Sequence, residues 1–322
     1  MAQDGIRKDR TVQCLRGLAI CAVVTIHTNA EGIAGVWIRP HVNYCVALFI
    51  FLSGYLTKID SIDWRILYGK RIKRVLYPYL IWTLIYSVVY KSPLSFGVYV
   101  LTGSAASPFY FFLVYIQFVL LTPVIARLLR SRIRRLGWLI TPVTILLARY
   151  LPAFTGVKLG FPFPAANFLV WFSFFYFGLA IGNGILSPAI SIRKYVLYYS
   201  LALVFSTVEG IAWYNMGNMD MATTQIRLSS FLSSMMACLL AYSFIARKSL
   251  SDSTISRVLA KIGDYSFGIM LSHMLIIRII DKAKLAFLFF PLKTILTIGL
   301  SFVIAYTGNR LLGKNSKLLG FV

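Results

Sequence analysis

The chain alternates long apolar stretches with short basic clusters, and this alternation most constrains its fold. A helix needs about 20 mostly apolar residues to cross a bilayer, because its backbone groups must be hydrogen-bonded internally there. We identify ten such stretches, at residues 12–30, 43–57, 75–90, 109–126, 136–150, 166–185, 195–214, 226–246, 263–280 and 285–306. The stretch 93–103 is too short to span and is expected to lie in the membrane interface. The sequence therefore predicts an all-α, polytopic transmembrane helix bundle.

Composition supports the same fold class. Hydrophobic residues make up 58% of the 322 residues and charged residues only 13%, whereas soluble domains are about 25% charged. The segments between the apolar stretches are too short to hold a hydrophobic core of their own. Residues 1–322 are therefore expected to form a single membrane domain with no separate soluble domain. Basic residues before the first apolar stretch resemble the start of a signal peptide, but no clear cleavage site follows, so we expect a retained helix.

The basic residues set the expected orientation. The formal net charge is +23, which taken alone would suggest nucleic-acid binding. However, Lys and Arg gather between apolar stretches, as in cytoplasmic loops held against anionic lipid. These clusters lie at residues 7–10, 58–74, 127–135, 193–194, 247–261 and 310–317. We therefore expect membrane lipids and no nucleic acid as partners, and both termini in the cytoplasm, with Lys282 and Lys284 as outward-facing exceptions.

Two ionisable residues in the first stretch are candidate site residues. Arg16 and His27 are eleven residues apart, close to three helical turns and about 16 Å along the axis. Both side chains therefore project from one face, which must point into the bundle because lipid would not accept it. A cation near the cytosol and a deeper imidazole are suited to a reaction channel. The alternative is an Arg that reaches the headgroups and a His hydrogen-bonded to a neighbouring helix.

Further intramembrane polar residues extend this candidate site. His273 is a second imidazole near the middle of a span, and Glu31 is one turn beyond His27 if that helix continues. Arg71 and Arg74 share one face at the cytoplasmic end of the third stretch, where guanidinium forks suit phosphate oxygens. They are equally consistent with an ordinary positive-inside cluster.

Two other groups of residues favour structural roles. Glu209 and Arg227 are expected to pair across the seventh and eighth stretches. The four cysteines, Cys14, Cys21, Cys45 and Cys238, form no CxxC or metal-ligand spacing, so we interpret them as small buried apolar residues. The three histidines do not have the spacing of a metal site either, and no metal is expected.

Five motifs, in order along the chain, resemble the membrane acyltransferase-3 family. The sequence LRGLA at 15–19 with His27 resembles the Arg-x10-His pattern of its first helix, and FIFLSGYL at 49–56 resembles its second-helix FxxSG signature. RIKR at 71–74 followed by PYLIW at 78–82 is similar to its third-helix entrance. The sequence FFL at 111–113 with Gln117 and Pro123 resembles its "WFL" helix, and DYSFGI at 264–269 with His273 resembles its late "SYGIYLIH" stretch. The motifs cover nearly the whole chain.

This resemblance implies an O-acyltransferase of a bacterial cytoplasmic (inner) membrane. The donor would be cytosolic acetyl-CoA or a related acyl-CoA, and the acceptor a hydroxyl of a surface or lipid-linked carbohydrate such as lipopolysaccharide. Arg16, Arg71 and Arg74 would bind the donor. Ser53 and Gln117 lie in the matching motifs and Tyr110 directly precedes the FFL segment; all three would bind substrate. His27, with His273 and Glu31, would be catalytic, His27 acting as general base or as transient acyl carrier.

Two other functional classes remain open at this point. A transporter or flippase for a lipid-linked sugar would also need many spans and buried charges, but it would use no acyl-CoA and form no ester. A structural membrane subunit would tolerate His27→Ala without losing any product. Fold resemblance does not by itself prove function.

Overall fold

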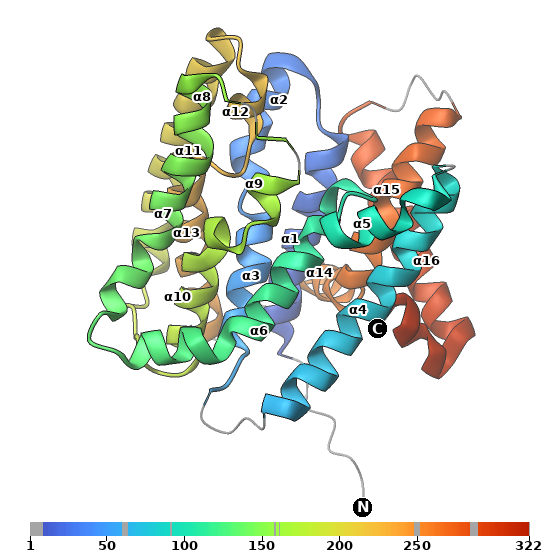
Figure 1. Ribbon diagram of the computed structural model, residues 1–322, viewed down its shortest axis with the longest axis horizontal. Helices are drawn as coiled ribbons and strands as arrows, with labels where there is room; N and C mark the ends of the chain where they lie inside the picture. Colours follow the sequence, from blue (N-terminus) through green and yellow to red (C-terminus); the bar gives the residue numbers. More distant parts are fainter. Residues whose placement is uncertain are drawn as a thin grey trace, which may run out of the picture.

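The structure, a computed structural model, describes residues 9–59, 64–90, 92–157, 159–160, 162–247, 252–283 and 289–321. These residues form helices and connecting turns, with no strand among them, so the predicted all-α polytopic bundle is confirmed (Figure 1). The long helices are α1 (Arg10–Thr28), α4 (Trp64–Val89), α6 (Tyr110–Arg130), α11 (Ile192–Asn215), α13 (Leu228–Arg247), α15 (Ser266–Lys282) and α16 (Leu292–Leu312). Shorter helices are α2 (Gly32–Val42), α3 (Cys45–Tyr55), α5 (Phe96–Thr102), α7 (Ile140–Ile145), α8 (Leu151–Thr155), α9 (Phe163–Ala166), α10 (Phe172–Gly182), α12 (Met219–Thr223) and α14 (Thr254–Asp264). Tight 3₁₀ or π turns precede or follow several of them: η1 (Pro93–Ser95), η2 (Ser107–Phe109), η3 (Arg134–Trp138), η4 (Leu146–Tyr150), η5 (Phe168–Trp171) and η6 (Gly313–Leu319).

Six helices of the described chain are long and apolar enough to cross a membrane, or seven if α14 and α15, bent by 78°, make one span. The prediction of ten spans remains a prediction. Two of the expected stretches, 136–150 and 166–185, coincide with shorter apolar helices at Ile140–Thr155 and Phe168–Gly182. A third, 75–90, forms the apolar half of α4, whose first half is basic.

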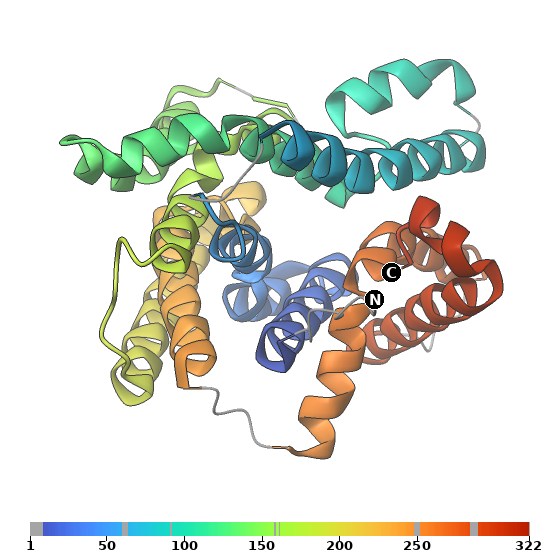
Figure 2. The same cartoon turned by 90° about the horizontal axis from the view of Figure 1, so that it is seen from below.

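The second span begins earlier than the sequence suggested. Helices α2 and α3 together make one span from Gly32 to Tyr55, with a turn at Asn43 and Tyr44. The expected stretch, 43–57, covered only the second half. The first half was overlooked because Arg39 and His41 interrupt its apolar pattern. Seen from below, α1 and α3 lie in the middle of the bundle, with later helices around them (Figure 2).

Glycines let α3 and α10 pack backbone against backbone. A Cβ added at Gly54 would lie 2.3 Å from the carbonyl oxygen of Phe175, and one at Gly178 would lie 2.1 Å from that of Phe51. Small residues at such contacts let membrane helices approach closely, where van der Waals packing can stabilise them. Gly54 is thus the part of the second-helix signature that the fold itself requires.

Glycines make the same kind of backbone-to-backbone contact between α1 and α14. A Cβ on Gly17 would lie 2.1 Å from the carbonyl oxygen of Leu259, and one on Gly263 would lie 1.9 Å from that of Gln13. Because Gly17 directly follows Arg16, this contact fixes the start of the helix that carries both candidate residues of the first span.

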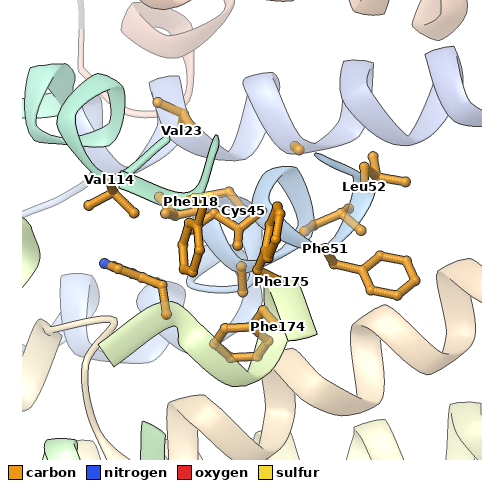
Figure 3. Packing of buried hydrophobic residues seen from close by; sticks show 14 of the residues in the cluster. Val23, Cys45, Phe51, Leu52, Val114, Phe118, Phe174 and Phe175 are labelled. Atoms are coloured by element: carbon orange, nitrogen blue, oxygen red, sulfur yellow. The ribbon is translucent and has the colours of Figure 1, made fainter. Parts of the chain in front are cut away.

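Aromatic side chains fill the centre of the bundle. Phe118 of α6 stacks on Phe175 of α10, with ring centroids 4.6 Å apart and planes inclined by 12°, and Phe51 of α3 lies nearby (Figure 3). All three are essentially buried. Offset stacking of this kind contributes beyond the burial of area alone, and it joins α3, α6 and α10 into one core.

The expected pairing of Glu209 and Arg227 is confirmed. Arg227 Nε lies 3.9 Å from Glu209 Oε2, and its other guanidinium nitrogens donate to the carbonyl oxygens of Met221, Ala222 and Ser206. The Arg227 side chain is fully buried, so its charge is balanced within the fold. This cluster has a structural role, and it ties α11 to the start of α13.

We predict that Gly54→Ala lowers the stability of the folded protein by about 1–3 kcal/mol, because the added methyl group meets the backbone of α10. The thermal midpoint of the detergent-purified protein measures this. Gly69→Ala is the matched control: Gly69 lies in α4 with nothing within 4 Å of the added Cβ, so alanine should be neutral or slightly stabilising there. Equal midpoints for the two variants would contradict the close contact.

Candidate functional site

A first cavity, the arginine cavity, is lined by Arg16 of α1, by Arg71 and Arg74 of α4 and by Ser53 of α3. Its volume is about 330 Å³. Aromatic residues of α6 and the first turns of α15 complete its wall. The three arginines expected to bind the donor therefore lie around one space, together with Ser53.

The arginine cavity carries an excess of positive charge. No Asp or Glu belongs to its lining among the described residues. A hydrogen bond orients the Arg71 side chain, because its Nη1 donates to Thr57 Oγ1 at 2.6 Å. Thr57 Oγ1 in turn donates to the Ser53 carbonyl oxygen at 2.7 Å. Like charges gathered without a carboxylate repel one another, so the cavity favours a polyvalent anion.

A second cavity, the histidine cavity, is lined by His27 of α1, Arg39 of α2, Cys45 of α3, Tyr110 of α6 and Gln225. Its volume is about 240 Å³. Val23 and Cys45, both labelled in Figure 3, belong to its apolar wall. Tyr110, expected to bind substrate, thus shares a cavity with His27.

The two intramembrane histidines are neighbours. The ring centroids of His27 and His273 lie 5.4 Å apart. His273 is fully buried on α15 and lines neither cavity, whereas His27 faces the histidine cavity. His273 Nδ1 lies 2.9 Å from the Ile269 carbonyl oxygen, which can only accept, so Nδ1 carries the proton. Nε2 of the neutral ring then holds a lone pair, and it has no partner among the described residues.

The expected geometry of Glu31 is wrong. Helix α1 ends at Thr28, and the backbone of Asn29 is extended, so the helix does not continue to residue 31. Glu31 instead precedes α2 and its side chain is exposed. The signal was present in the sequence, because Gly32, with φ of +63°, follows at once and favours a break.

Gln117 lies away from both cavities. Its Nε2 donates to the Ala166 carbonyl oxygen at 3.1 Å, and its Oε1 accepts from the Phe168 amide at 3.4 Å. The side chain therefore holds the segment before α10 against α6. Its expected role in substrate binding remains a prediction that this geometry does not favour.

Arg39 is a site residue that the sequence analysis missed. Its Nε donates to the Thr223 carbonyl oxygen at 2.8 Å, and its Nη1 donates to that of Ile26 at 3.1 Å, directly before His27. The available signal was an arginine within an otherwise apolar span, which is a functional hypothesis by default. It went unused because α2 had not been recognised as part of that span.

Phe111 and Met270 belong to the walls of both cavities. These two side chains, from α6 and α15, separate the arginine cavity from the histidine cavity, and we call them the partition. Both are apolar and unbranched at Cβ, and Met in particular adapts its shape readily. Movement of the partition would join the two cavities into one passage along α1.

In the part of the chain that the structure describes, no group of three or more His, Cys, Asp or Glu side chains is placed to hold a metal ion. The cysteines are free thiols. Cys14, Cys45 and Cys238 are buried and Cys21 is partly buried.

The chain can now be compared with known proteins. A family model described as an acyltransferase domain, that of the acyltransferase-3 family, matches residues 9–307. No curated protein and no solved structure matches. The fold and the family together define a multi-pass membrane protein that transfers acyl groups. The chain belongs to the membrane acyltransferase-3 family.

We predict that pyrophosphate raises the thermal midpoint of the detergent-purified protein through the arginine cavity. An anion that binds only the folded state at about 100 times its Kd stabilises by about 2.7 kcal/mol. Arg71→Gln and Arg74→Gln should each remove most of this shift. Arg135→Gln is the matched control, because Arg135 is exposed in η3 and lines neither cavity. The same shift in all three variants would show that the anion binds elsewhere.

Proposed function

We propose that this acyltransferase moves an acyl group, most simply acetyl, from cytosolic acyl-CoA to a hydroxyl of a cell-surface or lipid-linked carbohydrate. Its setting would be a bacterial cytoplasmic membrane. One observation carries the proposal: in a chain of this family, a cavity with three arginines and a cavity with a histidine meet at a two-residue partition.

The arginine cavity suits the donor. Coenzyme A carries several phosphate groups, and guanidinium forks bind phosphate oxygens bidentately. Arg71 and Arg74 lie toward the start of α4, and Arg16 lies near the start of α1. If these arginines bind the phosphates of acyl-CoA, its thioester end would extend toward the partition. Apolar side chains of α6 and α15 would surround the pantetheine arm and the acyl group.

The histidine cavity suits the chemical step. His27 accepts the proton of the acceptor hydroxyl while the hydroxyl oxygen attacks the thioester carbonyl carbon. The carbon–sulfur bond then breaks, an ester forms, and the thiolate of CoA takes the proton from the imidazolium. No further reactant is required. The ring centroid of His273 lies 5.4 Å from that of His27, and its Nε2 has no hydrogen-bond partner among the described residues. We assign His273 the role of positioning the His27 ring.

We predict that His27→Ala abolishes the acyl ester while the protein still inserts. A general base typically contributes about 10² to 10⁴-fold. Mass spectrometry of surface glycans would compare deletion cells complemented with wild type, with His27→Ala or with His41→Ala. His41 is an exposed histidine of α2 that lines neither cavity, so this matched control should restore the ester.

The same experiment separates the transporter alternative. A transporter would leave glycan acylation unchanged in the deletion strain, with unmodified glycan retained inside the cell. An ester that persists in the normally expressed His27→Ala strain would instead contradict the assignment of His27.

We also predict that Met270→Trp slows transfer by roughly 100-fold, because a bulky partition keeps the thioester outside the near-attack distance. Binding of CoA to the purified protein, measured by titration calorimetry, should be little changed. Met274→Trp, one turn further along α15 on a partly buried residue outside both cavities, is the control. Unimpaired transfer by Met270→Trp would remove the partition from the route of the acyl group.

A further inference from the structure

Arg39 is held in place by backbone atoms alone. Helix α1 ends at Thr28, so the Ile26 carbonyl oxygen is one of the acceptors that a helix end leaves without an intrahelical partner. Arg39 Nη1 donates to it, and Nε donates to the Thr223 carbonyl oxygen. A guanidinium has five N–H donors, so these bonds fix its direction and leave donors for a ligand.

Among the described residues, no carboxylate forms an ion pair with Arg39. Among the described residues that line the histidine cavity, none is Asp or Glu. The nearby carboxylates have other partners or face solvent. Asp220 pairs with Arg149 at 2.7 Å, Glu209 pairs with Arg227, and Glu31 is exposed. An unpaired cation away from bulk water is unfavourable unless an anion joins it.

Arg227 is also surrounded by carbonyl oxygens, but it differs from Arg39 in having a carboxylate partner. Arg227 is fully buried, has a carboxylate partner and lines neither cavity. Arg39 faces a space that also contains the neutral polar side chains of Ser107 and Gln225. These groups could bind hydroxyls, whereas Arg39 is suited to a charged group.

We infer that the histidine cavity binds an acceptor that carries an anionic group, a carboxylate or a phosphate, close to the hydroxyl that is acylated. This inference rests on the proposed function and narrows its acceptor to an acidic one. The anion on Arg39 and the hydroxyl at His27 would be held at a fixed separation, because Arg39 is bonded to the residue preceding His27. Specificity would then come from the distance between the charged group and the hydroxyl.

Chemical labelling of His27 tests this without requiring acyl transfer. Diethyl pyrocarbonate modifies accessible imidazoles, and peptide mass spectrometry would measure the rate at His27 in the detergent-purified protein. The probes are glucuronate, glucose 1-phosphate and glucose. We expect one or both anionic sugars to protect His27 at concentrations about tenfold or more below those that glucose needs, because charged hydrogen bonds are the stronger ones. The more effective anion identifies carboxylate or phosphate as the group bound.

Arg39→Gln should remove the difference between anionic and neutral sugars, and Arg39→Lys should retain part of it. The shift of the thermal midpoint by pyrophosphate in the arginine cavity shows whether each variant is folded. Equal protection by glucose and by both anions in wild type, or undiminished anion protection in a folded Arg39→Gln protein, would overturn the inference. Failure of the proposed function would look different, since glycan acylation would then be unchanged in the deletion strain whatever the labelling shows.

Discussion

Hydrocarbon provides neither hydrogen bonds nor counter-charges, so every polar group within the bundle must find its partners inside the protein. The arginines of this chain meet that demand to different extents. Arg227 has a carboxylate as counter-charge and donates to several carbonyl oxygens. Arg39 has two carbonyl oxygens, and the arginines of the first cavity share a space without any carboxylate among its described lining. A carboxylate partner thus distinguishes Arg227, which holds the fold, from the arginines that line the two cavities.

The positions of the site residues depend on close helix contacts. Gly17 and Gly263 let α14 lie against α1, and Gly54 and Gly178 do the same for α3 and α10. Arg16 and His27 lie on one continuous helix, about 16 Å apart along its axis at 1.5 Å per residue. Because α1 contributes to both cavities, it fixes the separation between Arg16 and His27.

Periodicity and charge were sufficient to predict the fold class and to select Arg16, Arg71 and Arg74 as candidates, whereas the family resemblance was needed to group them as donor-binding residues. Hydropathy identifies membrane helices because each helix satisfies its own backbone hydrogen bonds. A separation of three turns places Arg16 and His27 on one face of α1, whichever helices pack against it. Which helices pack against α1 depends on the tertiary structure, which the local sequence does not determine. Nothing local to His273 or Arg39 shows that both approach His27, and Gln117 has the same polarity whether it binds a sugar or a loop. The predicted position of Glu31 was wrong for a local reason, because the prediction extended the first helix through residues that end it.

The partition also bears on the membrane as an insulator. A membrane that holds an electrical potential stores energy, and moving one elementary charge through 100 mV corresponds to about 2.3 kcal/mol. Two polar cavities arranged along one helix would, if continuous and wet, offer ions a route through that barrier. Phe111 and Met270 place an apolar septum between them, and a narrow apolar constriction excludes water and the ions that travel with it. If the proposed transfer moves an acyl group between the cavities, the two side chains that make way for it would also block ions between turnovers. This requirement would limit how far the passage could widen for larger acyl chains.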